Sequence, residues 1–400
     1  MPKLLVLTYI PSPYQVELFN AIALSGKFNL QVAYLYARCE AAIASQWQQF
    51  NIKHNYLILN DCPEYYQQLE QNIDSSDLII FNYYRHPRIS NLIAHCISFN
   101  KPWCFWGERP GFKHSGLLGK LYRRWKLAKL HQSSVAIWGV GTWGVEGYRR
   151  EFGDRRSYFN LPYFSDLSRF PNSSTTVSNS NSNQRVFLYS GALIKRKGVD
   201  LLAAAFCRLA EQFKHIRLHL LGEGDLRRSL EHKLTEYHQQ VQFFGFQSWD
   251  KLPYYYQQAD ILCVPSRYDG WGLVVPEGLA AGLPVISTRR TGAAIDLIKD
   301  GSNGWLIDTN DSESLYQAMY QAVTLSPSEL ANYSQAASDR ALEHSLEHGV
   351  QRFQQAATET IKEFYIDNSP KQNNIQITFT AGVRGGRNVP ARGSGGKFPQ

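Results

Sequence analysis

The chain has 400 residues, enough for two or three domains that each bury a core of their own. Hydrophobic residues make up 44% of it and aromatic residues 13%, which is typical of a globular protein and excludes a disordered one. The formal net charge of +8 favours anionic partners such as nucleotide sugars or lipid headgroups, and we expect no nucleic-acid partner.

The cysteines and the apolar runs indicate a compartment. The six cysteines are scattered without CxxC or CxxxC spacing, so we expect no metal site, no disulfide framework and a reducing cytoplasm. The apolar run at residues 4–7 is too short for a signal peptide, and no segment approaches the length of a transmembrane helix. We therefore expect a cytoplasmic protein.

Strand and helix patterns alternate through the first half of the chain. Short apolar runs predict strands at residues 4–9, 30–36, 56–59, 78–82, 103–106 and 134–140. A helix is expected over residues 15–24, with Ser12 as its cap and Pro13 at its first position, followed by Tyr14. This alternation predicts a doubly wound, Rossmann-like domain over residues 1–170.

Glu108 follows the predicted strand 103–106 and should face the crevice beyond the carboxyl ends of the strands. A carboxylate there can bind a sugar hydroxyl or assist proton transfer. The alternative is a salt bridge to Arg109 or a helix start.

Residues 116–130 predict an amphipathic helix in a stretch without acidic residues. Its apolar face carries Leu117, Leu118, Leu121, Trp125 and Ala128, and its basic face carries Lys120, Arg123, Arg124 and Lys126. This pattern is typical of a helix lying on an anionic membrane surface. The alternative is a helix packed on the sheet with a solvated basic face.

A Ser/Asn-rich linker over residues 171–184 separates the two halves. Strands are predicted at residues 186–190, 218–221, 241–245, 261–264 and 284–287, with helices between them. A second Rossmann-like domain should therefore span residues 185–343. A helix over 344–366 and a disordered basic tail over 367–400 complete the chain.

The stretch from Ala259 to Ile286 carries the clearest chemical signal. A strand, a loop with Gly270 and Gly272, a helix bearing Glu277 and a second strand make one βαβ unit. Backbone amides of such a loop can bind phosphate, while the carboxylates of Asp269 and Glu277 can accept sugar or ribose hydroxyls. This combination suits a nucleotide sugar, and the alternative is an ordinary glycine turn.

A basic cluster, Lys195-Arg196-Lys197, follows the first strand of the second domain. Its position at the carboxyl end of a strand suits pairing with a diphosphate. The alternative is a solvated charge cluster.

Five motifs in order and spacing resemble the retaining glycosyltransferases of family 4. They are Ser190-Gly191 through Lys197-Gly198, Gly222-Glu223-Gly224, Val241 to Gly245, Ala259-Asp260 through Pro284-Val285, and Asn303-Gly304-Trp305-Leu306. The resemblance covers residues 185–325. It implies the GT-B fold, two Rossmann-like domains facing across a cleft, with no metal or other cofactor needed.

The resemblance also implies residue roles. Lys197 would take the diphosphate, Glu277 the ribose hydroxyls and Asp269 the transferred sugar. With Glu108, Lys197 and Asp269 form the predicted catalytic set, and the acceptor would bind near Ser12, Pro13 and Tyr14. The predicted donor site comprises Gly191, Arg196, Lys197, Gly222, Glu223, Gly245, Phe246, Asp269, Gly270, Trp271, Gly272, Leu273 and Glu277.

Three departures from the family pattern stand out. Asp269 replaces a glutamate, Ala192 stands where many members have a phosphate-binding arginine, and Glu108 stands where many have a histidine. The resemblance implies a glycosyltransferase that uses a nucleotide sugar and a glycan, lipid-linked or small-molecule acceptor, in polysaccharide or glycolipid synthesis. Alternatives are a GT-B epimerase or a non-catalytic nucleotide-sugar binder.

Overall fold

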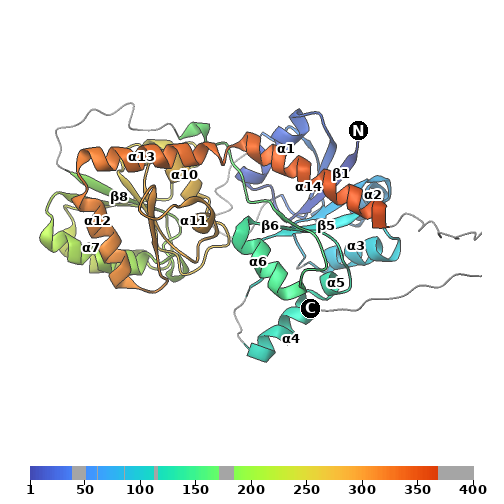
Figure 1. The fold of residues 1–400 in the computed structure, drawn as a ribbon, viewed down its shortest axis with the longest axis horizontal. Helices are drawn as coiled ribbons and strands as arrows, with labels where there is room; N and C mark the ends of the chain where they lie inside the picture. The colour runs from blue at the N-terminus through green and yellow to red at the C-terminus, as the bar shows by residue number, and fades with distance from the viewer. Residues whose placement is uncertain (38–50, 61, 85, 112–115, 171–183, 368–400) are drawn as a thin grey trace, which may run out of the picture.

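The computed structural model of the chain describes residues 1–37, 51–60, 62–84, 86–111, 116–170 and 184–367. These residues form two domains, each built on one parallel β-sheet (Figure 1). The predicted linker lies outside the described residues except for its last position, and the predicted tail except for its first.

The N-terminal domain has a seven-stranded sheet in the order β3-β2-β1-β4-β5-β6-β7. Its strands are β1 (Lys3–Thr8), β2 (Asn29–Tyr34), β3 (Asn55–Ile58), β4 (Leu78–Phe81), β5 (Trp103–Gly107), β6 (Ile137–Gly139) and β7 (Tyr158–Asn160). The central strands β4 and β5 are buried along their whole length because helices cover both faces of the sheet.

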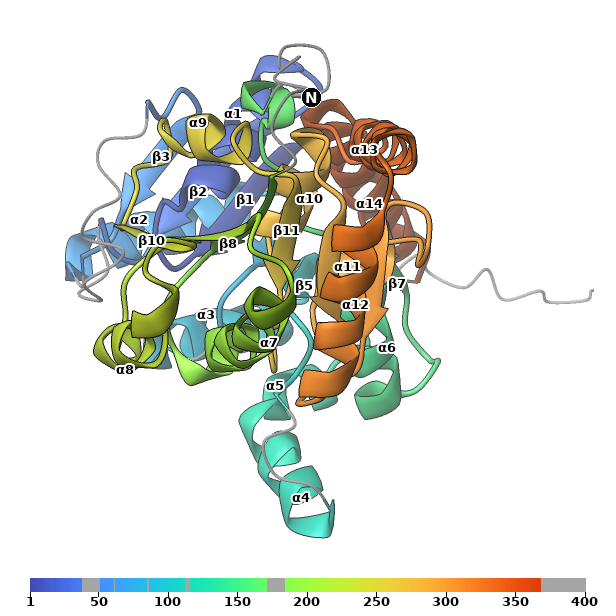
Figure 2. The same ribbon diagram turned by 90° about the vertical axis from the view of Figure 1, so that its left-hand side faces the viewer.

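Helices connect these strands, and all of them except α4 pack around the sheet (Figures 1 and 2). They are α1 (Pro13–Leu24), α2 (Pro63–Ser75), α3 (Pro87–Ser98), α4 (Gly116–Lys126), α5 (Ala128–His131) and α6 (Gly141–Phe152). Three of them begin with proline, whose fixed φ and missing N–H suit the first helical position.

The C-terminal domain has a six-stranded sheet in the order β10-β9-β8-β11-β12-β13. Its strands are β8 (Arg185–Ser190), β9 (Ile216–Leu221), β10 (Val241–Gly245), β11 (Ile261–Val264), β12 (Val285–Thr288) and β13 (Gly304–Ile307). Its helices are α7 (Val199–Gln212), α8 (Arg227–Lys233), α9 (Leu252–Tyr256), α10 (Val274–Ala280), α11 (Gly292–Leu297), α12 (Ser312–Thr324) and α13 (Pro327–Leu342).

The last helix, α14 (Leu346–Asp367), leaves the C-terminal domain and packs along the N-terminal one (Figure 1). The indole N–H of Trp138 donates to the Thr360 hydroxyl at 3.1 Å, and the Trp138 and Phe353 rings lie 5.3 Å apart. The hydroxyl of Ser157 donates to Glu363 at 2.8 Å. The chain therefore crosses between the domains twice.

The predicted fold of two doubly wound, Rossmann-like domains is confirmed. Strand β7, three residues at the edge of the sheet, was not predicted, and β6 is shorter than predicted. Ser12 occupies the N-cap position of α1, but its side chain does not cap the helix; the hydroxyl donates to the Gln15 side chain instead. The domain boundaries drawn from the sequence stay a prediction.

Helix α4 projects from the body of the N-terminal domain in both views (Figures 1 and 2). Leu117 is 74% exposed, Leu118 80% and Trp125 68%, so the alternative of an apolar face packed on the sheet is wrong. The basic face also differs from expectation at one position, because Arg123 donates to the buried carboxylate of Glu151 at 2.8 Å. Within the described residues, no helix has the length and apolar character needed to cross a bilayer.

Candidate functional site

The loop between β11 and α10 lies at the carboxyl end of the C-terminal sheet. The Asp269 amide donates to the Arg290 carbonyl at 2.9 Å, so the loop is held against the segment that follows β12. Gly272 has φ +89°, and a Cβ there would lie 2.7 Å from the Thr291 methyl group. Only glycine fits such a backbone and such a close approach, and Leu273 then serves as the N-cap residue of α10.

The basic cluster after β8 is directed at this loop. Residues Lys195–Lys197 form one 3-10 turn, and Lys197 Nζ donates to Asp269 Oδ2 at 2.5 Å. The guanidinium of Arg196 donates to the Tyr268 carbonyl at 2.8 Å. These contacts are not those of a solvated charge cluster, because two of the three cations are bonded to the loop.

A second ion pair, which the sequence analysis missed, holds the basic turn at residues 195–197 in place. Arg267 donates through both terminal nitrogens to the Asp200 carboxylate, at 2.6 and 2.9 Å, and also to the Lys195 carbonyl at 2.5 Å. Burial raises the pKa of Asp200, but its bonds with Arg267 outweigh burial and lower it overall. Bidentate pairing fixes the relative orientation of the loop and the basic turn.

Glu277 is 2% exposed and lies inside the C-terminal domain. Burial raises the pKa of its carboxyl to about 8, against a smaller lowering by the hydrogen bond from Tyr256. That hydroxyl donates to Glu277 Oε2 at 3.0 Å. The side chain is therefore held by α9, a contact that the sequence did not indicate.

Glycines end or follow strands β8, β9 and β10 of this sheet and pack closely on one another. A Cβ on Gly222 would lie 2.0 Å from the Gly191 carbonyl oxygen, and the Gly222 amide donates to the Gly245 carbonyl at 2.7 Å. The neighbouring Glu223 carboxylate accepts from Arg227 at 3.1 Å, and Phe246 is half-buried. The predicted donor residues of β8, β9 and β10 therefore form one continuous edge.

Glu108 of the N-terminal domain reaches this loop. Its Oε2 atom lies 1.9 Å from the position that a Cβ on Gly270 would occupy, so the carboxylate rests against the glycine backbone. Burial raises the pKa of Tyr268 to about 12, and the negative charges of Glu108 and Asp269 add to this while Arg109 and Arg196 oppose it. Residues from both domains thus surround one tyrosine.

The predicted acceptor residue Tyr14 is within the electrostatic influence of Glu108. Burial raises the pKa of Tyr14, opposed by a hydrogen bond with Ser12 and reinforced by the charge of Glu108. The Tyr14 and Tyr163 rings lie 4.8 Å apart. The charge of Glu108 therefore acts on Tyr14, which follows Pro13, the first residue of α1.

A buried polar network supports this part of the N-terminal domain. Gln15 Nε2 donates to Asn82 Oδ1 at 2.7 Å, and Thr8 Oγ1 donates to the same oxygen at 3.0 Å. Asn82 Nδ2 donates to the Trp106 carbonyl at 2.9 Å. These contacts tie the ends of β1, β4 and β5 together, and their partners are too far apart in the sequence for local patterns to reveal them.

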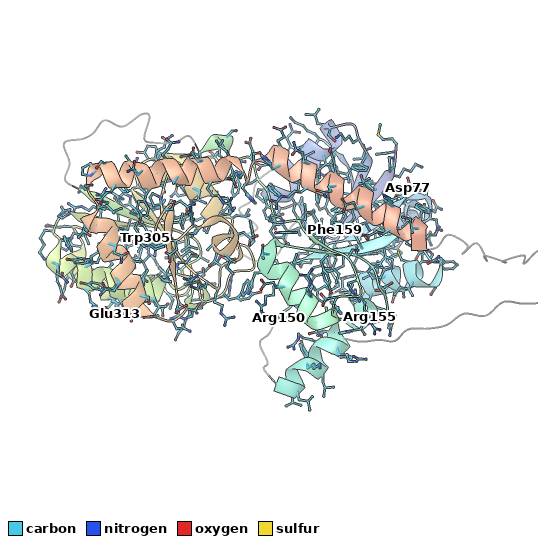
Figure 3. The ribbon with its side chains drawn as sticks, viewed as in Figure 1. Asp77, Arg150, Arg155, Phe159, Trp305 and Glu313 are labelled. Atoms are coloured by element: carbon cyan, nitrogen blue, oxygen red, sulfur yellow. The ribbon has the colours of Figure 1, made fainter. Side chains whose placement is uncertain are left out.

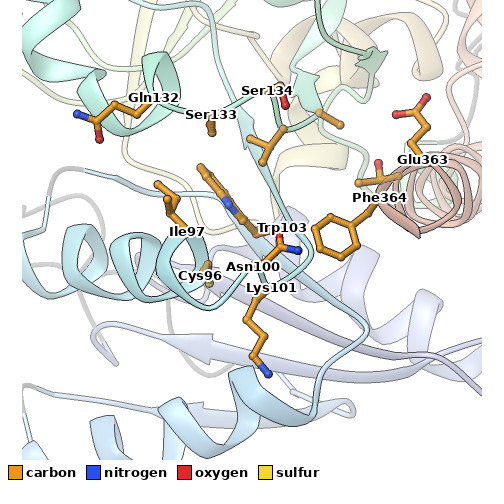
Figure 4. A pocket seen from close by; sticks show the side chains of 13 residues that line it. Cys96, Ile97, Asn100, Lys101, Trp103, Gln132, Ser133, Ser134, Glu363 and Phe364 are labelled. Atoms are coloured by element: carbon orange, nitrogen blue, oxygen red, sulfur yellow. The ribbon is translucent and has the colours of Figure 1, made fainter. Parts of the chain in front are cut away.

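Within the described residues, the predicted site coincides with neither a metal-ligand cluster nor the cavity at Trp103. The described residues contain no cluster of three or more His, Cys, Asp or Glu side chains suited to a metal ion. A cavity of about 330 Å³ lies at the opposite end of the N-terminal sheet, between Trp103, Gln132 and Phe364 (Figure 4). It shares no residue with the predicted site.

Comparisons with known proteins agree with the geometry. Residues 173–340 match the family described as glycosyl transferases group 1. An uncharacterised glycosyltransferase of Methanocaldococcus jannaschii is 31% identical over 137 residues, which are 34% of this chain and 37% of that protein. A lipopolysaccharide core biosynthesis glycosyltransferase of Rhizobium meliloti is 33% identical over 140 residues, 34% of this chain and 39% of the relative.

Solved structures match most of the chain in fold. HepE of Anabaena, solved in complex with UDP, superposes with a TM-score of 0.72 at 16% identity, covering 90% of this chain and 100% of HepE. The aligned region spans less than two fifths of either sequence relative, whereas the likeness of fold includes both domains. The chain has the GT-B fold, and residues 173–340 match the glycosyl transferases group 1 model, which together support a glycosyltransferase.

Proposed function

We propose that this protein is a retaining glycosyltransferase of family 4, a hexosyltransferase that moves a sugar from a nucleotide-diphosphate sugar to an acceptor. The observation that carries the proposal is the meeting of Glu108 with Gly270 beside the Lys197–Asp269 ion pair. A donor bound at the C-terminal loop would then face the acceptor residues Ser12, Pro13 and Tyr14. The relative in lipopolysaccharide core biosynthesis supports a glycan or lipid-linked acceptor in cell-surface polysaccharide or glycolipid synthesis.

The chemistry needs stabilisation of a leaving diphosphate. Departure of the diphosphate leaves oxocarbenium character on the sugar, and positive charge near the departing oxygens lowers the barrier. Lys197 and Arg196, which are held at the loop, would supply that charge, with backbone amides of residues 270–273. No metal ion takes part in the reaction as proposed.

Donor binding would alter the ion pair of Lys197 with Asp269. In the structure its ammonium pairs with Asp269, so the phosphate would share the ammonium or displace the carboxylate. A carboxylate released from the lysine can accept hydroxyls of the transferred sugar. Retention would follow from attack on the face that the diphosphate leaves, with a phosphate oxygen taking the acceptor's proton.

The nucleotide would lie along the glycine edge of β8, β9 and β10, with Glu277 accepting the ribose hydroxyls. Because burial keeps this carboxyl neutral at pH 7, losing its hydrogen bond to the ribose costs about 0.5–1.5 kcal/mol, or about two- to tenfold in affinity. We expect Glu277→Ala to weaken UDP binding by that factor in calorimetry while the protein stays folded. Glu236, an exposed acid of the same domain, changed to Ala, is the matched control.

Helix α4 supports a peripheral association with an anionic membrane. Its exposed leucines and Trp125 share the helix with the exposed cations Lys120, Arg124 and Lys126. Such a helix binds a membrane surface by apolar insertion and by attraction to anionic lipid. The protein would then work at the cytoplasmic face of a membrane, where a lipid-linked acceptor is available.

A donor screen tests the proposed function. The protein is incubated with labelled nucleotide sugars and an acceptor panel, with and without a chelator, and the products are separated. UDP sugars come first because HepE was solved with UDP. Transfer that survives the chelator supports the proposal; an epimerised donor, or binding without turnover, would contradict it in favour of an epimerase or a nucleotide-sugar binder.

A further inference from the structure

The N-terminus of α6 is capped by a residue of the other domain. The Thr142 amide donates to both carboxylate oxygens of Asp296, at 2.9 and 3.2 Å. Val140, the N-cap residue of α6, offers no side-chain cap of its own. The first amides of a helix need acceptors, and a carboxylate there also meets the positive end of the helix dipole. Asp296 therefore accepts from the Thr142 amide, for which the N-cap residue Val140 provides no side-chain acceptor.

The adjoining contact is equally close. Gly141 has φ +74°, and a Cβ on it would lie 2.6 Å from the Trp271 ring and 3.2 Å from Asp296 Oδ2. Trp271 is 1% exposed and immediately follows Gly270, against which the Glu108 carboxylate rests. The same approach of the two domains thus caps α6 and brings Glu108 to the loop.

Further contacts support this junction between the domains. The Trp143 and Tyr268 rings lie 5.4 Å apart, and the Arg109 guanidinium lies 4.5 Å from the Trp143 ring centre. The Asp296 carbonyl accepts from the Arg340 side chain at 2.6 Å, which ties α11 to α13. Helix α6, with Arg150 labelled on it, runs from this junction into the N-terminal domain (Figure 3).

We infer that Asp296 is a positioning residue that holds the two domains together by capping α6, and so aligns Glu108 with the donor loop. Asp296 is linked to the donor loop through Gly141, whose Cβ position faces both Asp296 and Trp271, one of the predicted donor residues. The effect on turnover rests on the proposed function, whereas the effect on domain arrangement does not. Removing the carboxylate should open the junction and leave each domain folded.

The test compares the parent with Asp296→Ala and Asp296→Asn. Asp308, an exposed acid of the same domain, changed to Ala, is the matched control. Hydrogen exchange is measured at the start of α6, and X-ray scattering gives the radius of gyration. We expect Asp296→Ala to speed exchange of the Thr142 amide by tenfold or more and to increase the radius of gyration. Asp296→Asn, which keeps an oxygen acceptor, should fall between parent and Ala.

Activity gives an independent readout. If the screen finds a donor, Asp296→Ala should lower kcat by tenfold or more with UDP affinity within about twofold of the parent. Unchanged exchange and scattering in Asp296→Ala would overturn the inference whatever the activity is. A preparation without any transferase activity, but with faster exchange and a larger radius in Asp296→Ala, would contradict the proposed function and leave the capping contact standing.

Discussion

Lys197 Nζ donates to Asp269 Oδ2 at 2.5 Å, so the cation and the acid that were expected to bind different parts of a donor are paired with each other. Both side chains are largely buried, at 22% and 13% exposure. The pair places the Lys197 ammonium at the donor loop. It also fixes the position of the Asp269 carboxylate, which would contact the transferred sugar.

We expect Asp269→Glu to keep the affinity for UDP and to change the ranking of donor sugars. The carboxylate would extend one methylene further, so sugar hydroxyls would meet it in a different place. Initial rates over a panel of nucleotide sugars check this, with Asp308→Glu on the exposed surface as control. Identical rankings in parent and variant would show that Asp269 does not contact the sugar.

The second prediction uses the contact between Glu108 and Gly270. In Gly270→Ala the new methyl group would take the place of the Glu108 carboxylate, which is the end of a flexible side chain and can swing away. We therefore expect Gly270→Ala to change the free energy of unfolding by less than about 1 kcal/mol and to reduce transfer as strongly as Glu108→Ala does.

A double-mutant cycle decides whether the two residues act as one unit. Residues in contact are not additive, so Gly270→Ala should cost little further activity in the Glu108→Ala background. Gly111→Ala is the control, because a Cβ there meets nothing within 4 Å. Full additivity of the two changes would mean that Glu108 does not work through its position at Gly270.

How far the sequence could predict this site depends on the distance between partners. The strand runs and the glycine loop are local patterns, so the βαβ unit from β11 to β12 was predicted close to its observed bounds. The contact of Thr142 with Asp296 joins residues 154 positions apart, and neither has a pattern that names the other. The hydrogen bond from Tyr256 to Glu277 could not be predicted either, since the sequence does not distinguish a buried tyrosine that makes such a bond from any other core residue.

Exposure was the other quantity that the sequence left open. The pattern of α4 was the same for a helix packed on the sheet and for one presented to a membrane, and only the tertiary structure separates them. Arg123 illustrates the limit, because its partner Glu151 lies on α6. A basic face read from helical periodicity therefore contained one residue that the fold uses for an ion pair.

The third prediction concerns pH. Burial raises the pKa of the Glu277 carboxyl from 4.5 to about 8, so the native protein holds a proton that the unfolded chain releases above pH 4.5. Stability from this group is complete below pH 4.5 and declines as pH rises to about 8. The free energy of unfolding should fall by up to ~1.4 kcal/mol per pH unit in that window.

Urea unfolding of the parent and Glu277→Gln at pH 5, 6, 7 and 8 checks this. The buried His344 acts in the opposite direction, since burial lowers its pKa to about 4. The contribution of His344 to the free energy of unfolding is therefore lost as pH falls from 6.5 towards 4. His344 is present in both proteins, so the difference between their curves isolates Glu277. Parallel curves would mean that the Glu277 carboxyl is ionised in the native protein throughout.

The last prediction concerns α4. Each basic residue near an anionic surface contributes about 1 kcal/mol, so the exposed cations Lys120, Arg124 and Lys126 should give binding that weakens as salt increases. We expect the protein to float with vesicles of increasing anionic content and Lys120→Glu/Arg124→Glu to float much less. Arg123 is left unchanged because its ion pair with Glu151 is part of the fold.

Two comparisons separate the membrane from bulk charge. Lys251→Glu/Lys299→Glu makes the same change of net charge on exposed positions of the C-terminal domain and should float like the parent. Leu118→Ser/Trp125→Ser keeps the charge but removes apolar groups that are 80% and 68% exposed, and should lose binding even at low salt. If both charge-reversed variants lost flotation equally, the attraction would come from the net positive charge of the protein and not from α4. The exposed leucines of α4 would then need another partner.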